Sequence, residues 1–280
     1  MHISDLHLET VPESFCPGVM ESLSRSAPLL RDQRPDFIVC TGDLTSHGSA
    51  RRGNLALARE WLDALGIPYL TLPGNHDQGA NRRRGRDYPE TEFYEDVPFA
   101  ETNFGRVFQQ DVLVTRDLGP VTVVAVAVRD GDPDGAVERL DAALAATRGP
   151  VIVCGHYPVV RVRDEGVLAT FGFAESIPAT APVLAQCMRR HDNVVLYLCG
   201  HVHASTKRPI SDRLVQLTGG GLGPGPSVFR MLQVNAAGLD WTTHFGGGPL
   251  DFWMSREAGL SVLPEYHLGH PEERVGHISF

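Results

Sequence analysis

The sequence is poor in positive charge relative to negative charge. Lys and Arg number 25 against 34 Asp and Glu, so the 280-residue chain has a formal net charge of −9 at pH 7. Proteins that bind nucleic acids generally carry a basic surface, and this balance argues against general affinity for nucleic acid. It does not argue against a small phosphate ester, because bound cations would reverse the sign of the field locally.

The chain also lacks paired cysteines. Its five cysteines include no CxxC pair, and an odd count without close spacing does not indicate a disulfide framework. Three of them end apolar runs, where a free thiol behaves as a small hydrophobe. We therefore expect buried, reduced cysteines; the five are Cys16, Cys40, Cys154, Cys187 and Cys199.

Long hydrophobic segments are missing as well. No stretch approaches the roughly 20 apolar residues of a membrane span. The beginning of the chain shows no basic segment followed by an apolar one, so no signal peptide is visible. These absences predict a cytoplasmic protein that is not attached to a membrane.

Short apolar runs alternate with amphipathic helical patterns along the chain. The runs are rich in β-branched residues and suit strands covered on both faces; they are residues 36–40, 67–72, 121–128, 150–154 and 194–199. The helix candidates between them are residues 19–33, 50–65, 135–148 and 180–191. Such alternation predicts an α/β fold with crossover connections.

Three regions depart from this alternation. Residues 78–110 are polar and arginine-rich and are typical of a long loop or a small cap. Residues 219–226 form a Gly/Pro loop, and residues 246–280 have weak periodicity, as expected of a C-terminal extension. We find no internal repeat and no clean compositional break, so we predict a single domain over residues 1–280.

Carboxylate, imidazole and amide side chains gather in five short clusters, each of which follows or ends an apolar run. The clusters are Asp5-Leu6-His7, Gly42-Asp43, Gly74-Asn75-His76-Asp77, Gly155-His156 and Gly200-His201-Val202-His203. In an α/β sheet the carboxyl ends of the strands form one rim, where ligands bind. Side chains delivered to that rim can hold two divalent cations about 3.5–4 Å apart, an arrangement used for displacement at phosphorus.

Most of the clusters have an ordinary interpretation when taken singly. Asp43 can cap the following helix, Asn75 and His76 can form a turn, and a lone His156 can be a core residue. The pair His201 and His203 is harder to explain without a shared partner, because two buried imidazoles would each need hydrogen bonds. The recurrence of all five clusters after strand-like runs carries the prediction of a metal site.

In this order, D-x-H, G-D, G-N-H-D, G-H and G-H-x-H resemble the calcineurin-like metallophosphoesterase superfamily, over residues 5–203. The resemblance implies a four-layer α-β-β-α sandwich with two mixed β-sheets and a metal site at the strand C-terminal rim. It also implies ligand roles. Asp5, His7 and His203 would hold one metal, Asn75, His156 and His201 the other, and Asp43 would bridge both.

The chemistry of these groups agrees with the implied roles. A carboxylate can bind two cations through its two oxygens whereas an imidazole cannot, so the shared ligand should be Asp43. Oxygen and imidazole ligands without thiolate suit Mn, Fe or Zn and do not select among them. Two such cations would lower the pKa of a water held between them enough to supply hydroxide near neutral pH.

His76 is left over from the ligand count. Its place beside Asn75 makes it the candidate to protonate the leaving oxygen, and Asp77 the candidate to orient or charge His76. The alternative for Asp77 is the cap of a turn.

The signals for substrate are weaker. Arg82 and Arg83 are candidate contacts to the substrate phosphate because arginine matches phosphate geometry, with a solvated loop as the alternative. Tyr157 is a further candidate. Its motif Gly155-His156-Tyr157-Pro158 resembles that of purple acid phosphatases, whereas Asp5-Leu6-His7 resembles the cyclic-nucleotide and glycerophosphodiester phosphodiesterase branch.

These features predict a phosphoesterase with two divalent or trivalent metal ions that acts on a small phosphate ester. A phosphodiesterase for a small diester such as a cyclic nucleotide is the first choice, and a phosphomonoesterase with the same metal site is the alternative. A non-catalytic metal-binding scaffold and a nuclease are more remote. The sequence leaves the oligomeric state open, a homo-oligomer included.

Overall fold

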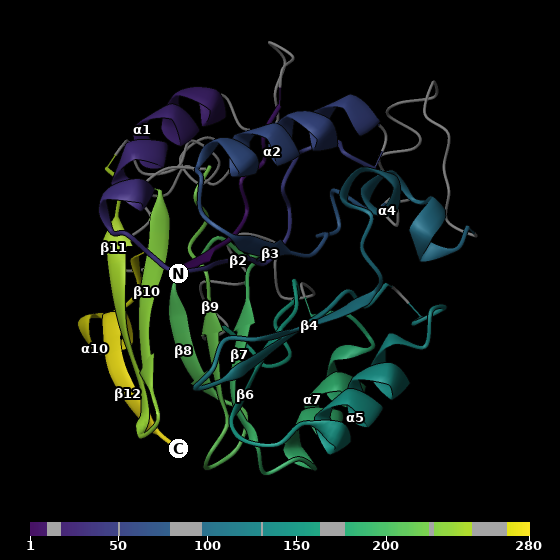
Figure 1. The fold of residues 1–280 in the computed structure, drawn as a ribbon, viewed down its shortest axis with the longest axis vertical. Coiled ribbons are helices and arrows are strands. Elements are labelled where there is room, and N and C mark those ends of the chain that lie inside the picture. Colours follow the sequence, from purple (N-terminus) through teal and green to yellow (C-terminus); the bar gives the residue numbers. More distant parts are fainter. Residues whose placement is uncertain are drawn as a thin grey trace.

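Two six-stranded mixed β-sheets form the centre of the computed structural model, which describes residues 1–9, 18–49, 51–78, 97–129, 131–162, 177–223, 227–247 and 268–280 (Figure 1). The first sheet runs in the order β12 (Val275–Ser279), β11 (Gly238–Phe245), β10 (Val228–Asn235), β1 (His2–Ile3), β2 (Ile38–Cys40) and β3 (Tyr69–Thr71). Strands β1, β2 and β3 are parallel, and β10 joins β1 in the antiparallel sense. The three strands that precede predicted ligands therefore end at one edge.

The second sheet runs in the order β4 (Leu113–Asp117), β5 (Thr122–Val126), β6 (Val151–Cys154), β7 (Val194–Cys199), β9 (Val215–Thr218) and β8 (Thr206–Pro209). Strands β5, β6, β7 and β9 are parallel, whereas β4 and β8 pair in the antiparallel sense at the two edges. The predicted ligands of this sheet follow its two central strands, β6 and β7.

The two sheets pack face to face through alternate residues of their strands. Val123 and Ala125 of β5 belong to a buried cluster that includes Val39 and Leu70 of the other sheet. Val124 and Val126, which point to the opposite face of β5, belong to the larger core beneath the helices. A strand with both faces covered needs apolar residues throughout, which explains the uninterrupted apolar runs of the sequence.

Helices cover the outer faces of the sheets. Figure 1 shows α1 (Val19–Asp32) and α2 (Arg52–Ala64) over the first sheet, and α5 (Ala136–Ala146) and α7 (Ala181–Arg189) beside the second. The layers are therefore helix, sheet, sheet and helix, and this confirms the predicted four-layer sandwich. Among the described residues, no helix is both long enough and apolar enough to cross a membrane.

The regular elements agree well with those predicted. All five apolar runs form strands, namely β2, β3, β5, β6 and β7, and the four helical patterns form α1, α2, α5 and α7, with ends within two residues of the expected ones. Cys40, Cys154, Cys187 and Cys199 are buried and free, as expected, and Cys16 lies outside the described residues.

The segment over residues 78–110 is more regular than predicted in its last part. Residues 79–96 lie outside the described residues. After them come a short 3-10 helix, η1 (Phe99–Glu101), and the helix α4 (Asn103–Phe108), which the Thr102 side chain caps by accepting from Gly105 N at 3.0 Å. Since α4 packs against α2, this part belongs to the body of the fold rather than to a loop.

The end of the chain is also more integrated than predicted. Residues 248–267 lie outside the described residues, but α10 (Pro271–Arg274) leads into β12, which completes the first sheet. The predicted C-terminal extension thus includes a strand that joins the first sheet. An edge strand with alternately exposed residues has no apolar run to reveal it.

Candidate metal centre

Five of the seven predicted ligands have a left-handed backbone conformation. Of the nine non-glycine residues with positive φ in the described ranges, five are these ligands: Asp5, His7, Asp43, His201 and His203. Such conformations cost about 1–3 kcal/mol each and persist where the surrounding structure imposes them. The strand ends therefore turn sharply at the positions that aim these side chains at one point.

Backbone hydrogen bonds between the strand-end loops hold these turns. Asp5 N donates to Gly42 O and His7 N to Asp43 O, both at 2.9 Å. Across the sheets, His201 N donates to Asp5 Oδ1 at 3.0 Å. The loop after β1 is thus fixed to the loop after β2 and to the loop after β7.

The side chains of the first group of proposed ligands lie close together. Ligand atoms of Asp5, His7 and His203 all lie within 4.8 Å of one another. The Nε2 atoms of His7 and His203 are 2.9 Å apart, and His203 Nε2 is 3.7 Å from Asp5 Oδ1. These three side chains come from both sheets.

The second group converges beside the first. Asp43, His156 and His201 place ligand atoms within 4.8 Å of one another. Asn75 joins them through its Oδ1, which is 3.0 Å from His156 Nε2. The structure therefore brings together all seven side chains that the sequence singled out as ligands.

Asp43 lies between the two groups. Its Oδ2 is 3.7 Å from His7 Nε2, a member of the first group, and 3.3 Å from His156 Nε2, a member of the second. It is almost completely buried, with 1% of its surface exposed. This is the position required of a carboxylate that two cations share.

The polar atoms of the centre fit bound cations better than they fit one another. The Nδ1 atom of His201 is buried and has no hydrogen-bond partner within the described part of the chain. A buried polar group without a partner costs about 1–3 kcal/mol. A cation held by these imidazole nitrogens and carboxylate oxygens would remove that cost, so the donor set fits a metal centre.

The electrostatics of the centre favour protons or cations. Burial raises the pKa of Asp5 to about 7, with Asp43 adding to the rise and His156 opposing it. Burial also works against ionisation of Asp43, but the His156 and His76 imidazoles hold the pKa of that carboxyl well below its usual range. In return, although burial opposes it, Asp43 raises the pKa of His156 to about 9. A cation entering the centre would compete with these protons.

Two glycines allow the loops to approach this closely. A Cβ on Gly74 would overlap Asp43 Oδ1 and its backbone N, and a Cβ on Gly200 would overlap Ser4 Oγ and lie 2.5 Å from Asp5 Oδ2. The glycines that precede the ligand motifs are thus required by the packing of the ligands themselves.

His76 sits at the edge of the centre. Its Nδ1 donates to the Ser46 carbonyl at 2.9 Å, which leaves Nε2 directed toward the ligands, 3.8 Å from Asp43 Oδ2. The side chain is mostly buried, with 8% of the residue exposed.

Asp77 accepts four hydrogen bonds from the loops after β2 and β3. Its Oδ2 accepts from Leu44 N and Gly74 N, both at 2.9 Å, and its Oδ1 accepts from Thr45 N at 3.1 Å and Thr45 Oγ1 at 2.8 Å. Burial and the Asp43 carboxylate raise the pKa of Asp77 to about 7, while these donors oppose the rise. Asp77 thus joins the loops after β2 and β3, and the orientation of His76 comes from Ser46 instead.

Comparison with known proteins identifies the origin of this centre. The sequence model of the calcineurin-like phosphoesterases matches residues 1–205, well over half of the chain. The chain belongs to this family. It is therefore a metallophosphoesterase, an enzyme that hydrolyses phosphoric esters.

Individual relatives are distant in sequence. A probable cyclic nucleotide phosphodiesterase of Synechococcus sp. is 26% identical over 72% of this chain and 71% of its own. A probable glycerophosphodiester phosphodiesterase, GpdQ, of Arcobacter nitrofigilis is 25% identical over 83% of this chain and 78% of its own. Among solved structures, a dimetal phosphatase from Danio rerio superposes with a TM-score of 0.62, covers 88% of this chain and 95% of its own, and is 13% identical, which shows a shared fold.

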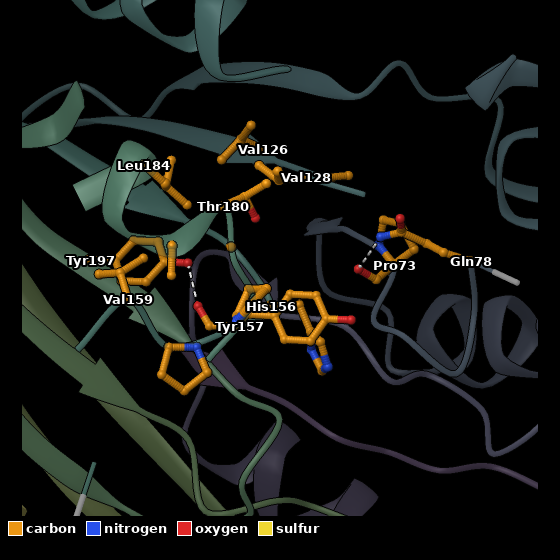
Figure 2. A pocket seen from close by; sticks show the side chains of 15 residues that line it. Pro73, Gln78, Val126, Val128, His156, Tyr157, Val159, Thr180, Leu184 and Tyr197 are labelled. Carbon is orange, nitrogen blue, oxygen red and sulfur yellow. Dashed lines mark hydrogen bonds between the residues drawn. The ribbon is translucent and has the colours of Figure 1, made fainter. Parts of the chain in front are cut away.

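Tyr157 lies against the metal centre of this phosphoesterase. Its ring packs edge-on to His201, with centroids 4.7 Å apart, and to His156 at 5.1 Å. Figure 2 shows His156 and Tyr157 in a pocket that Val126, Val128, Thr180 and Leu184 also line. The pocket therefore places largely apolar surface next to the ligands. Arg82 and Arg83, the other predicted substrate contacts, lie outside the described residues.

A further group of metal-binding residue types lies on the outer helices α5 and α7 and just beyond the end of α7. Asp141, Cys187 and His191 have ligand atoms within 4.8 Å of one another. The Arg190 guanidinium donates to the same Asp141 oxygen as His191, at 2.9 Å, and neutralises the carboxylate. Hydrogen bonds therefore account for this group.

The sequence did not reveal the group that orients His76, because it is a backbone carbonyl. It also gave no role to Glu9 and His47, which are 3% and 5% exposed and lie beside the ligand loops. The only available signal was proximity, since Glu9 is two residues beyond His7 and His47 is four beyond Asp43.

Proposed function

We propose that this phosphoesterase is a phosphodiesterase that acts on a small diester such as a cyclic nucleotide, with two metal ions held by Asp5, His7, Asp43, Asn75, His156, His201 and His203. The convergence of these seven side chains into two groups that share Asp43 carries the proposal. The preference for a diester is supported by the form of the first motif, Asp5-Leu6-His7, and by the names of the two relatives, both phosphodiesterases.

The metals would supply Lewis-acid stabilisation of the phosphoryl oxygens and a nucleophile at neutral pH, whether they are Mn, Fe or Zn. Asp43 would hold the two sites close together, because it is buried and its Oδ2 lies near both groups of ligands, while its Oδ1 accepts a hydrogen bond from His76 N. The imidazoles of His7, His156, His201 and His203 would supply neutral ligands from opposite sheets, so the sheets set the shape of the centre.

His76 would act on the leaving group. Its Nδ1 is occupied by the Ser46 carbonyl, so Nε2 is the atom that can carry a proton to the leaving oxygen. An alkoxide leaving group needs this proton, as in a cyclic nucleotide or a glycerol diester. Asp77 would contribute by holding the loops of Asp43 and Asn75 in register rather than by touching the substrate.

A phosphomonoesterase with the same centre is the second candidate function, favoured by the likeness of Gly155-His156-Tyr157-Pro158 to a phosphatase motif. The test compares turnover of bis(p-nitrophenyl) phosphate and p-nitrophenyl phosphate by the Mn-loaded enzyme. We expect kcat/KM for the diester to be the larger. If monoester turnover is larger by tenfold or more, the phosphodiesterase proposal fails. Asp43→Ala must abolish both activities, which shows that both substrates use this centre.

A further inference from the structure

A buried carboxylate and a buried imidazole are hydrogen-bonded to each other just outside the metal centre. Glu9 accepts from His47 Nδ1 through Oε2 and from Asn54 Nδ2 through Oε1, the second bond at 2.8 Å. The three residues are 3%, 5% and 5% exposed. Neither Glu9 nor His47 is among the grouped metal-ligand residues of the described chain.

Stability alone does not account for such a group. Removing a carboxylate from water is expensive, and apolar residues of similar size often stabilise a fold as well or better. What a buried hydrogen-bonded pair does provide is a fixed geometry, since each partner restricts the other. The role of this pair should therefore depend on the loop whose geometry it fixes.

His47 belongs to the loop that holds His76. The carbonyl of Ser46, which shares a peptide plane with His47 N, accepts from His76 Nδ1 at 2.9 Å. Three residues further on, Ser49 N donates to the His76 carbonyl at 3.0 Å. The loop thus contacts both the side chain and the backbone of His76.

The same loop is anchored at several other points. Arg51 N donates to His47 O at 2.7 Å, and Asn103 of α4 donates from Nδ2 to Gly48 O at 3.1 Å and to Ser49 O at 3.0 Å. At the Ser46–His47 peptide two side chains act as anchors. The Ser46 hydroxyl donates to His7 O at 3.2 Å, and His47 contacts the buried carboxylate of Glu9. A rotation of this peptide would move the carbonyl that orients His76.

We propose that Glu9 and His47 are positioning residues that act through His76: their hydrogen bond fixes the Ser46–His47 peptide, whose carbonyl holds the His76 imidazole with Nε2 toward the centre. The inference rests on the proposed role of His76 in leaving-group protonation. A displacement of about 1 Å in a catalytic group can reduce a rate by about 100-fold. A partial loss of orientation should therefore reduce turnover by about tenfold.

The first experiment reads the position of His76 without any substrate. In Zn-loaded protein, the ¹⁵N resonances of the His76 ring should report a proton on Nδ1 in the wild type. In His47→Leu and in Glu9→Gln, we expect a mixture of tautomers, whereas His47→Gln, which retains an N–H donor, should restore the wild-type pattern. An unchanged His76 tautomer in both His47→Leu and Glu9→Gln would overturn the inference, whatever the enzyme hydrolyses.

The second experiment uses two methyl aryl phosphodiesters, one with a p-nitrophenyl and one with a phenyl leaving group. The phenolate is more basic and depends more on a proton donor. We expect His47→Leu and Glu9→Gln to lower kcat for the phenyl ester by about tenfold and for the nitrophenyl ester by no more than about twofold, with KM and the metal content unchanged. His191→Gln, which removes a histidine–carboxylate contact on the remote helices, serves as the matched control.

The decisive comparison uses the His76→Ala background. If Glu9 and His47 act only through His76, adding His47→Leu to His76→Ala should change kcat by less than twofold. A tenfold effect of His47→Leu in both backgrounds, or a loss of bound metal in the single variants, would overturn the inference. Either result would indicate that the pair acts on the proposed metal ligand His7 instead. If His76→Ala itself leaves phenyl ester turnover unchanged, the proposed role of His76 in leaving-group protonation fails. The tautomer measurement then still decides whether Glu9 and His47 orient the His76 ring.

Discussion

At the scale of single residues, the metal centre depends on side chains whose backbone is strained. Asp5, His7, Asp43, His201 and His203 all have positive φ, a conformation uncommon for residues other than glycine. Hydrogen bonds between loops from different strands hold these turns in place. A ligand substitution therefore removes a donor from a backbone that stays preformed, and its effects should appear mainly in metal binding.

Asp43→Ala should weaken metal binding more than any other single ligand change, because both ions lose a ligand. We expect fewer than one Mn²⁺ per chain after equilibrium dialysis at a concentration that loads the wild type with two, measured by elemental analysis. Asp141→Asn, which alters a carboxylate on α5, is the matched control and should bind normally. Retention of two metals per chain by Asp43→Ala would refute the shared role of Asp43.

His76→Ala should have the opposite signature. Since His76 lies at the edge of the centre and is not one of the seven ligands, the variant should keep its metals while kcat for a diester with an alkoxide leaving group falls by about 100-fold or more. The measurement combines elemental analysis with steady-state kinetics on a cyclic nucleotide. Loss of metal from this variant would mean that His76 is a ligand.

At the scale of elements, the sequence predicted the strands that form uninterrupted apolar runs and missed those that do not. Strands such as β6 and β7 consist entirely of apolar residues, and proposed ligands follow their carboxyl ends. The apolar run and the motif after it therefore both indicated the same strand end. Strands β10, β11 and β12 are partly exposed to solvent, and polar residues interrupt their apolar ones. Their place in the first sheet depends on pairing between distant segments, which local patterns do not encode.

The same distinction applies within the site. The convergence of the seven proposed ligands could be predicted because each is a side chain of a metal-binding type in a motif beside a strand end. The orientation of His76 by the Ser46 carbonyl and the three backbone hydrogen bonds to Asp77 could not, because backbone groups are present at every position and only the fold decides which are close. The predicted link from Asp77 to His76 followed from adjacency in the sequence, whereas Asp77 accepts hydrogen bonds from Leu44, Thr45 and Gly74 and His76 donates to the Ser46 carbonyl.

The loops at the strand ends should be intolerant of added side-chain atoms. Gly74→Ala places a Cβ over Asp43 Oδ1, so the shared carboxylate must move. We expect the apparent metal affinity to fall by at least about tenfold, equivalent to about 1.4 kcal/mol, in titrations followed by calorimetry. The matched control is Gly53→Ala in α2, where nothing lies within 4 Å of the added atom and helix propensity should make the change neutral or stabilising. An unchanged affinity for Gly74→Ala would show that the Asp43 loop can adapt.

At the scale of the whole molecule, the metal centre joins the two sheets. Asp5, His7, Asp43 and Asn75 follow strands of the first sheet, whereas His156, His201 and His203 follow strands of the second. The buried cluster between the sheets holds their faces together, and the ligands do so at the rim. Cations bound there would connect the two halves of the sandwich and should therefore stabilise the fold as well as serve the reaction.

Metal binding should consequently raise the melting temperature, and the effect should grow with pH. A ligand that binds only the folded state adds about 1.4 kcal/mol for each tenfold excess over its Kd, and about 1 kcal/mol shifts the melting temperature by about 2–4 °C in a protein of this size. Below pH 7 both Asp5, with a pKa of about 7, and His156, with a pKa of about 9, hold protons that a cation must displace. The stabilisation by a fixed Zn²⁺ concentration should thus be small at pH 6 and increase through pH 7 toward pH 9, as measured by differential scanning calorimetry. Asp43→Ala should lose most of the metal-induced rise in melting temperature at every pH. An equal rise for the wild type at pH 6 and pH 8.5 would show that Asp5 and His156 do not hold the protons that compete with the metal.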